Sequence, residues 1–339
     1  MTKLQTLLGV SALAFAASTP AFAETVTLAA YSGIFQDHYM KAVVEPFMKA
    51  HPDIKVEFYG MPNSAQMLGT LRAQKAAPQI DVVIMDVSVA KAGTDEGLFD
   101  KVDESVSKNV ADLYPAAHAQ GVNGVGVTFD NLVLLYNKDQ VTTEPTSWNV
   151  LWDKQYAGKV AIPAVPDIQG TTLTIIANKM AGGGDYKKSV EAGIKKLTEL
   201  APNVQTWDPK PDVYAPIANG QAALGIGWNA RAQVYAKSTG KLGVVMPQEG
   251  SGFQINTINL VKSSPSNKAA KTFIDYALSP EAQTAFNEEM FYGPTNSKAK
   301  IAKTSRSMDK MIDIDWIAVA GIRDGITEQW RRRVIPLSR

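Results

Sequence analysis

Charged, aromatic and small polar residues stand where several apolar segments of this chain end. Residues 31–32, 86–88, 167–172 and 228–231 each come at or shortly after such a segment. Ligands of open α/β sheets bind beyond the carboxyl ends of the strands. Carboxylates accept hydrogen bonds from ammonium groups, and Arg pairs with acids through two parallel bonds. The pattern therefore predicts one ligand site built from several strand ends.

A catalytic or metal-binding set is not indicated. His38, His51 and His118 are far apart and lack metal-ligand spacing. The chain has no Cys to act as a nucleophile, and no G-x-S-x-G motif occurs. Glycines 182–184 follow a predicted helix and lack the Lys-Ser/Thr of a phosphate loop, so they indicate a helix end. We therefore expect no enzymatic activity, no metal site and no cofactor.

The first 23 residues have the pattern of a cleavable export signal. Lys3 gives a positive start, residues 7–17 are apolar, and residues 21–23 read Ala-Phe-Ala, a small-x-small cleavage site. The apolar run is shorter than the about 20 residues of a membrane-spanning helix. An anchor or a core helix is the alternative. Because no Cys is present, neither a lipid anchor nor disulfides are expected. We expect a free protein in a Gram-negative periplasm.

Length and charge limit the class of protein further. Single cores stop growing beyond about 250–300 residues, so residues 24–339 predict two domains. The formal charge is +1, and removal of Lys3 brings it to about zero. A neutral chain lacks the electrostatic footprint of a nucleic-acid binder, and no later apolar stretch reaches membrane-spanning length. The basic run 331–333 is expected to be the solvated end of a helix, with a docking patch as the alternative.

Apolar periodicity predicts alternating strands and helices, which indicate βαβ units and a mainly parallel sheet, hence an α/β fold. The predicted strands are residues 26–31, 54–59, 81–85, 121–128, 132–136, 160–163, 223–228 and 253–261. The predicted helices are residues 38–50, 65–76, 187–200, 231–238, 268–278 and 280–289.

Six short segments also carry a resemblance. They read SWNVLWDKQYAG at 147–158, PNV at 202–204, GQAALGIGWN at 220–229, PQEG at 247–250, ALSPEAQ at 277–283 and YGPTN at 292–296. In this order, over nearly the whole mature chain, they resemble the spermidine/putrescine-binding group of ABC-importer solute-binding proteins. The resemblance implies a two-lobed fold with hinge strands, one ligand trapped in the cleft between the lobes, and a permease as partner.

The expected lobes are discontinuous in sequence. Residues 24–128 with 256–297 would form the first lobe, and residues 129–255 with 298–339 the second. Strands would cross between them near residues 127–131 and 254–257. We expect a monomer that is not embedded in the membrane.

A polyamine site of this family needs carboxylates and aromatic walls, and the chain keeps part of that set. Tyr31 stands where the family has a Trp, and Trp228 and Tyr292 match aromatic wall residues. Asp167 falls near a carboxylate that binds an amine. The resemblance thus implies a cleft suited to an organic cation.

The departures from the family pattern shift the predicted ligand. Gly170 and Asn256 replace acidic residues, and Arg231 stands where the motif has a small or polar residue. Asp86 takes a position that is small and polar in the family and could accept an ammonium group. Fewer acids and an added Arg favour recognition of an anion.

We therefore expect the solute of an ABC importer that is an ω-amino acid or related zwitterion, such as 4-aminobutyrate, with Arg231 on the acid and Asp86 or Asp167 on the amine. A polyamine is the alternative. A ferric ion is a remote one, because Tyr214 and Tyr235 are not adjacent. The candidate ligand-binding residues are Tyr31, Ser32, Asp86, Ser88, Asp167, Gly170, Thr171, Trp228, Arg231, Asn256 and Tyr292.

Structural roles remain open for several of these residues. Arg231 could lie on the surface of its helix. Trp228 could be a core residue, and Asp86 could cap the helix that follows it. The backbone N–H groups at residues 32–33 and 170–172 could cap helices with no ligand.

Overall fold

The computed structural model describes residues 24–301 apart from 211, and residues 311–338 apart from 313. The predicted export signal, residues 1–23, lies outside the described residues. In the described part, strands and helices alternate along the chain, as the periodicity predicted. No helix there is long and apolar enough to cross a membrane.

The strands form one continuous twelve-stranded sheet that runs through both ends of the molecule. Its main path is β2-β1-β3-β10-β5-β8-β6-β7; β4 and β12 add to β10, and β9 and β11 add to β5. The strands are β1 (Glu24–Tyr31), β2 (Ile54–Met61), β3 (Val82–Asp86), β4 (Phe99–Asp100), β5 (Val125–Asn137), β6 (Val160–Ala161), β7 (Val204–Thr206), β8 (Leu224–Trp228), β9 (Leu242–Val245), β10 (Ser251–Val261), β11 (Gly293–Pro294) and β12 (Met311–Ile312).

Helices cover both parts of this sheet. They are α1 (Ile34–Tyr39), α2 (Glu45–Ala50), α3 (Ser64–Ala73), α4 (Val87–Asp95), α5 (Ile168–Met180), α6 (Glu191–Leu200), α7 (Tyr214–Ala218), α8 (Asn229–Thr239), α9 (Asn267–Ala277), α10 (Pro280–Met290) and α11 (Trp316–Gln329). A π-helical turn (Met40–Val44) joins α1 to α2, so the expected helix at residues 38–50 begins earlier and is not uniformly α-helical.

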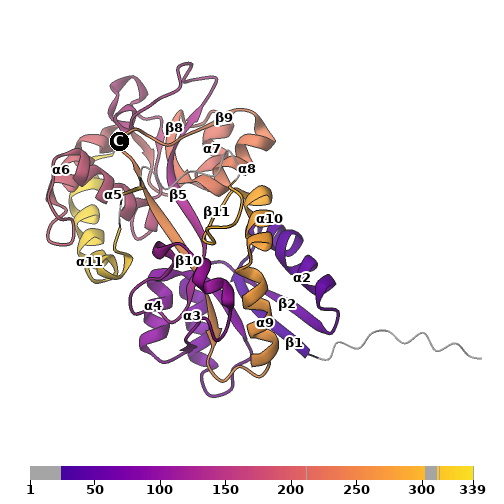
Figure 1. Ribbon diagram of the computed structural model, residues 1–339. Helices are drawn as coiled ribbons and strands as arrows, with labels where there is room; N and C mark the ends of the chain where they lie inside the picture. Colours follow the sequence, from indigo (N-terminus) through magenta and orange to yellow (C-terminus); the bar gives the residue numbers. More distant parts are fainter. Residues whose placement is uncertain (1–23, 211, 302–310, 313, 339) are drawn as a thin grey trace, which may run out of the picture.

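The first lobe is built on β1, β2 and β3. These three strands pair in parallel, β1 with β2 from Glu24 to Tyr31 and β1 with β3 at Leu28 and Ala29. β3 is buried along its whole length, as expected of a parallel strand covered on both faces. Helices α3, α4 and α9 lie around this sheet at one end of the molecule (Figure 1). Because β1 and β3 are neighbours and parallel, their carboxyl ends, Tyr31 and Asp86, lie at the same edge.

The second lobe gathers β6, β7, β8 and β9 with α5 to α8 at the other end (Figure 1). β6 pairs in parallel with both β7 and β8, whereas β8 and β9 pair antiparallel with β5. Because β10 also pairs antiparallel with β3 and β5, the sheet is mixed, and the expectation of a mainly parallel sheet is wrong. Trp148 is completely buried here, and its indole donates to the carbonyl of Gly250 at 2.8 Å. The segment at 147–158 that carried part of the resemblance therefore packs this lobe.

Two long strands pass from one lobe to the other. Thr128–Asn131 of β5 pair antiparallel with β10, and the next residues, Leu132–Tyr136, pair with β8. On β10, Phe253–Asn256 pair with β5 and Asn256–Leu260 with β3. The two strands that sequence placed at residues 121–128 and 132–136 are therefore one strand, because β5 continues from one sheet into the other. The lobe boundaries given above remain a prediction.

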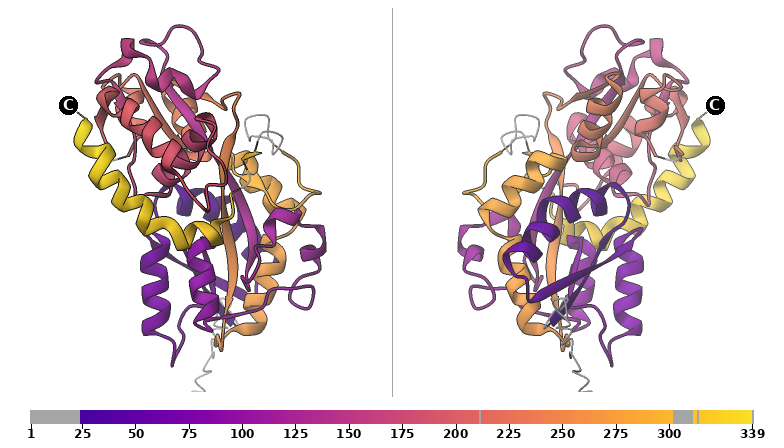
Figure 2. Two further views of the ribbon diagram at one scale, coloured as in Figure 1. Left: turned by 90° about the vertical axis from the view of Figure 1, so that its left-hand side faces the viewer. Right: turned by 90° about the vertical axis from the view of Figure 1, so that its right-hand side faces the viewer.

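The C-terminal helix α11 extends between the two lobes. Figure 2 shows it descending from the second lobe toward α4 of the first, which it contacts. Its first residue, Trp316, donates its indole N–H to the carbonyl of Phe253 on β10 at 2.7 Å. Just after its last turn, Trp330 is completely buried and donates to Thr174 Oγ1 of α5 at 2.8 Å. The basic run beyond it pairs with Glu328 and Glu191, consistent with a solvated helix end.

Candidate ligand-binding cleft

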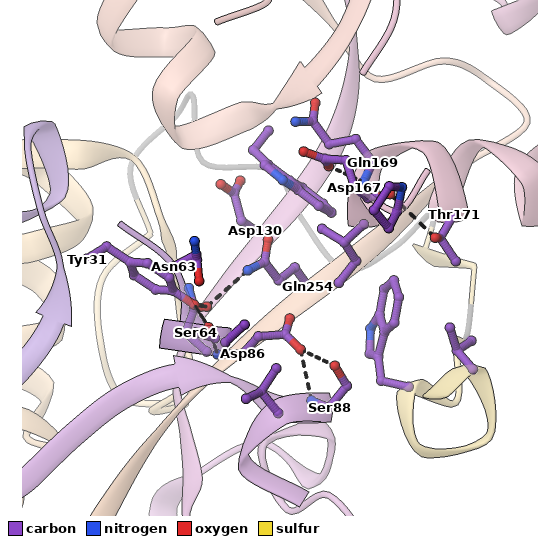
Figure 3. Close-up of a pocket in the computed structure, with 18 of the residues that line it drawn as sticks. Tyr31, Asn63, Ser64, Asp86, Ser88, Asp130, Asp167, Gln169, Thr171 and Gln254 are labelled. Atoms are coloured by element: carbon purple, nitrogen blue, oxygen red, sulfur yellow. Dashed lines mark hydrogen bonds between the residues drawn. The ribbon is translucent and has the colours of Figure 1, made fainter. Parts of the chain in front are cut away.

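A cavity of about 450 Å³ lies where the two lobes and the hinge strands meet. Residues from the ends of β1, β3 and β8, the start of α5 and α8, both crossing strands and α11 line it. Figure 3 shows Tyr31, Ser64 and Asp86 on one side, Asp167 and Gln169 on the other, and Asp130 and Gln254 between them. The structure brings nine of the candidate residues to this cavity: Tyr31, Asp86, Ser88, Asp167, Thr171, Trp228, Arg231, Asn256 and Tyr292.

Two candidate residues do not line the cavity. Ser32 is exposed, and its amide donates to the carbonyl of Met61 at 2.9 Å. Gly170 is buried in the first turn of α5, where a Cβ would lie 2.6 Å from the amide nitrogen of Val165 and 2.9 Å from the carbonyl of Pro163. Gly170 therefore allows α5 to pack against the backbone before it, which is a structural role. Gly170 also provides no carboxylate at a position where the family resemblance implies an acidic residue.

Asp86 both caps a helix and faces the cavity. Its Oδ1 accepts hydrogen bonds from the amide of Ser88 at 2.9 Å and from the Ser88 hydroxyl, at the start of α4. Its Oδ2 is buried and has no hydrogen-bond partner among the residues that the structure describes. Burial raises the pKa of Asp86, and the hydrogen bonds from Ser88 and the charge of Arg323 lower it in part. One oxygen therefore stabilises the helix while the other remains available to a donor.

Asp167 also caps a helix on the opposite wall, but unlike the buried Asp86 it is exposed to solvent. Its Oδ1 accepts from the amide of Gln169 at 2.8 Å and caps α5. Loss of hydration against the cavity wall raises the pKa of Asp167, and the Gln169 amide and the charges of Arg323 and Arg231 oppose that rise. Gln169 beside it is itself buried, and its Oε1 has no partner in the described part of the chain. Both strand-to-helix junctions thus present unpaired or partly solvated oxygens to the cavity.

Arg231 is a half-buried cation in the first turn of α8 and lines the cavity. Within residues 24–301 and 311–338, apart from the masked positions, no carboxylate lies within the 4.0 Å of an ion pair with it, and it makes no hydrogen bond there. Guanidinium groups stay protonated at all physiological pH values. Arg231 therefore presents an unpaired positive charge to the cavity, and the surface alternative is wrong.

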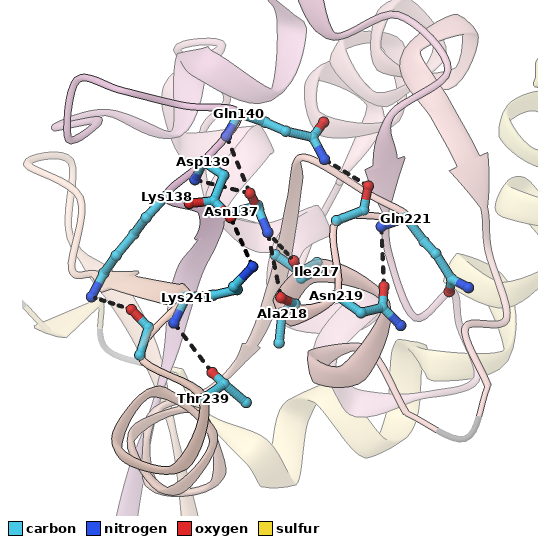
Figure 4. Close-up of polar contacts among 12 residues, drawn as sticks. Asn137, Lys138, Asp139, Gln140, Ile217, Ala218, Asn219, Gln221, Thr239 and Lys241 are labelled. Carbon is cyan, nitrogen blue, oxygen red and sulfur yellow. Dashed lines mark hydrogen bonds and ion pairs between the residues drawn. The ribbon is translucent and has the colours of Figure 1, made fainter.

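Trp228 is held at the cavity by its backbone. Its amide donates to the Tyr214 hydroxyl at 2.9 Å, and that hydroxyl donates to the carbonyl of Trp228 at 3.3 Å. Tyr214 lies on α7, which is tied to the end of β5: Asn137 Nδ2 donates to the carbonyl of Ile217 at 2.7 Å (Figure 4). Trp228 is half-buried, so it is a wall residue and not a core residue.

Asn256 is a positioning residue. It is 2% exposed, and its Nδ2 donates to Thr128 Oγ1 at 3.0 Å across a β-bulge between β10 and β5. Its Oδ1 accepts from the Tyr31 hydroxyl at 3.1 Å and from Gln254 Nε2 at 3.0 Å. The amide is therefore used in holding Tyr31 and Gln254 against the cavity. β-Bulges of this kind commonly re-aim side chains beside sites.

An aromatic cluster closes the side of the cavity near β1. Tyr292 stacks on Phe286 with ring centroids 5.4 Å apart, and Tyr31 meets Phe35 edge-on at 5.4 Å. Tyr31 and Tyr292 face the cavity from this cluster. Their rings can cover the methylene groups of a ligand and the face of a bound cation.

Sequence reasoning missed two charged residues of the cavity, Asp130 and Arg323. Asp130 lies on β5, within the stretch expected to cross between lobes, and is 3% exposed. Its Oδ1 accepts from the amides of Asn131 at 2.8 Å and Ala230 at 3.1 Å. Burial raises the pKa of Asp130 to about 7, and these amides and the charge of Arg231 lower it in part. The position of Asp130 in a predicted crossing strand could have identified it from the sequence. No sequence motif marks Arg323.

The cavity thus contains three carboxylates, Asp86, Asp130 and Asp167, and two guanidiniums, Arg231 and Arg323. Charges of both signs on facing walls suit a ligand that is itself zwitterionic. No group of three or more His, Cys, Asp or Glu side chains within the described ranges could hold a metal ion.

Comparison with known proteins identifies the family. A model described as "Bacterial extracellular solute-binding protein" matches residues 42–310.

The chain belongs to this solute-binding family.

Individual relatives agree with this placement. The gamma-aminobutyric acid-binding protein of Pseudomonas aeruginosa is 25% identical, over 94% of this chain and 90% of that protein. The spermidine/putrescine-binding periplasmic protein of Escherichia coli is 24% identical, over 87% and 84%. A solved structure of an ABC transporter substrate-binding protein from Bradyrhizobium japonicum has a TM-score of 0.76 at 22% identity, over 91% and 98%. The resemblance to the polyamine-binding group and the two-lobed fold are confirmed.

We expect Gly170→Ala to lower the free energy of unfolding by roughly 1–3 kcal/mol, because a Cβ there collides with backbone atoms. Urea titration measures the change. Gly69→Ala in α3 is the matched control, because no atom lies within 4 Å of its added Cβ; this variant should gain about 0.5–1 kcal/mol. An equal change in the free energy of unfolding in the two variants would contradict the packing role of Gly170.

The raised pKa of Asp130, about 7 against the ordinary 3.8, makes stability depend on pH. Between these values the folded protein holds a proton that the unfolded chain has released, so the free energy of unfolding falls as the pH rises through that window. Relative to Asp130→Asn, the wild type should lose on the order of a few kcal/mol between about pH 4 and pH 8. Urea titrations across that pH range measure the free energy of unfolding of both proteins. The same pH dependence in the wild type and in Asp130→Asn would contradict the prediction.

Proposed function

We propose that this solute-binding protein captures an ω-amino acid or related zwitterion, such as 4-aminobutyrate, in the periplasm and delivers it to the permease of an ABC importer. The observation that carries the proposal is a pair of unpaired opposite charges on facing walls: Asp86 Oδ2 on the first lobe and the Arg231 guanidinium on the second.

The ammonium group is assigned to Asp86. A buried carboxylate oxygen without a donor costs about 1–3 kcal/mol or more, which an ammonium N–H would recover. Asp86 is 7% exposed, so water replaces that donor poorly. The aromatic faces of Tyr31 and Tyr292 lie on the same cavity and suit the cation and its methylene groups.

The acid group is assigned to Arg231. A guanidinium binds a carboxylate through two parallel hydrogen bonds, and no carboxylate of the described residues lies within ion-pair distance of Arg231. Thr171 and Gln169, at the start of α5, line the same wall and can complete the polar shell.

The spacing of the charges favours an ω- over an α-amino acid. Of the two guanidiniums, Arg323 has the larger electrostatic effect on the pKa of Asp86, and Arg231 has the larger effect on that of Asp130. Asp86 caps α4 in the first lobe and Arg231 lies on α8 in the second, so the two charges line the cavity from different lobes. An α-amino acid holds both charges on one carbon, whereas several methylene groups separate them in 4-aminobutyrate. The relative named as a gamma-aminobutyric acid-binding protein supports this assignment.

Polyamine binding is the second candidate. The three cavity carboxylates and the relatives named for spermidine and putrescine favour it. The two guanidiniums oppose it, because a dication would have to approach both. Ferric binding has no comparable support: the Tyr214 hydroxyl is engaged with the backbone of Trp228, and its ring stacks on Tyr235.

The location and the absence of catalysis belong to the same proposal. The signal-like pattern of residues 1–23 and the relatives described as periplasmic support cleavage after residue 23 and a place in the periplasm. A monomeric state is part of the same proposal. The protein would bind its solute without chemical change and without a cofactor, while the permease and its ATPase perform transport.

Calorimetric titration with 4-aminobutyrate and with putrescine tests the ligand. We expect tighter binding of 4-aminobutyrate, and Arg231→Ala should weaken it by roughly 2–5 kcal/mol because a charged pair in the cleft is lost. The control Arg331→Ala removes an exposed arginine that pairs with Glu328, and it should leave affinity unchanged. Tighter binding of putrescine by the wild type would overturn the proposal, and an unchanged affinity in Arg231→Ala would remove Arg231 from the site.

Ligand binding should also close the cleft. A ligand that contacts both lobes binds the closed form better, and this difference in affinity drives hinge closure. Small-angle X-ray scattering should show a smaller radius of gyration with saturating 4-aminobutyrate. Arg231→Ala at the same ligand concentration should stay open. Identical curves for the free and saturated wild type would contradict closure.

A further inference from the structure

Arg323 is a second guanidinium of the cavity, placed there by the C-terminal helix. It lies near the middle of α11 and is half-buried. Its Nη2 donates to the carbonyl of Pro166 at 2.6 Å, directly before Asp167. No carboxylate of the described residues forms an ion pair with it. The hydrogen bond to the Pro166 carbonyl therefore holds the Arg323 guanidinium in place, and its positive charge is not neutralised by an ion pair with the described residues.

The helix that carries Arg323 is held rigidly at both ends. Asp315 caps its first turn by accepting from the amides of Ile317 and Ala318, and the Trp316 indole is bonded to β10. After its last turn, the buried Trp330 is bonded to α5. Between these anchors α11 contacts α4, the helix that Asp86 caps. Arg323 thus lines the same cavity as the two capping carboxylates, bonded to the residue before Asp167 and carried by a helix that contacts the one that Asp86 caps.

Electrostatics agree with this placement. The charge of Arg323 lowers the pKa of both Asp86 and Asp167, and on Asp167 its effect is larger than that of Arg231. Without Arg323, these two carboxylates on opposite walls would form a site for two ammonium groups. With it, a cation held by the carbonyl of Pro166 already lines the cavity that both carboxylates line.

We propose that Arg323 determines specificity by excluding diamines and polyamines, so that the cleft accepts a ligand with a single ammonium group. This role rests on the proposed function, because it explains how a fold shared with polyamine-binding proteins could prefer a zwitterion. With all groups ionised, three carboxylates and two guanidiniums give the cavity a formal charge of −1. A dication gains contact with Asp86 but must place its second charge beside Arg323. Specificity of this kind needs a repulsive element as well as an attractive one.

The test compares putrescine affinities of the wild type, Arg323→Gln and Arg323→Lys by calorimetry. Gln keeps an amide donor but lacks the charge, so Arg323→Gln should bind putrescine roughly tenfold or more tightly than the wild type. Lys keeps the charge, so Arg323→Lys should resemble the wild type. Arg323→Glu should tighten putrescine binding further. Melting curves of all variants verify that they fold.

The outcomes distinguish exclusion of diamines by Arg323 from a role of Arg323 in binding the acid, and they test the proposed ligand separately. Unchanged or weaker putrescine binding in Arg323→Gln, or equal affinities in Arg323→Gln and Arg323→Lys, would overturn the exclusion role. Loss of 4-aminobutyrate binding in Arg323→Gln would overturn it too, by making Arg323 part of the acid clamp. If the wild type fails to bind 4-aminobutyrate while Arg323→Gln gains putrescine, the proposed ligand is wrong and exclusion by Arg323 stands.

Discussion

The antiparallel pairing of β5 with β10 holds the two lobes together and creates the site. The register runs from Phe253 opposite Asn131 to Ile258 opposite Val125, and each strand then joins the sheet of one lobe. Backbone hydrogen bonds cannot slip by one residue without turning every side chain to the other face. This register therefore sets Asp130, Gln254 and Asn256 at the cavity, where the two lobes meet.

The chemistry of the cavity comes from helix ends as much as from the hinge. Asp86 caps α4 and Asp167 caps α5, each with one carboxylate oxygen. Capping fixes the orientation of a carboxylate and leaves its second oxygen for another donor. The capping role of Asp86 and the binding role that we propose for it use different oxygens of one side chain, so the two interpretations are compatible.

The charges of the cavity differ from those that the resemblance to the polyamine-binding group implied. Gly170 and Asn256 lack carboxylates because their places are occupied by close packing and by a positioning hydrogen-bond network. Arg231 and Arg323 add positive charge from two different helices. Selectivity among charged solutes thus depends on the sum of charges around one cavity, while the fold that presents them stays the same.

The sequence by itself determined the alternation of strands and helices and most wall residues, because apolar periodicity, capping residues and strand ends are local properties. The two-lobed family came from the resemblance of six short segments. Five wall residues lie at or shortly after the end of a strand and could be found in this way: Tyr31, Asp86, Asp167, Trp228 and Arg231. Only the tertiary structure brought Arg323 to the cavity, excluded Ser32 and gave Gly170 its packing role. The reason is physical: α11 reaches the cleft through anchors on β10 and α5 that are far from it in sequence, and no local pattern encodes such contacts.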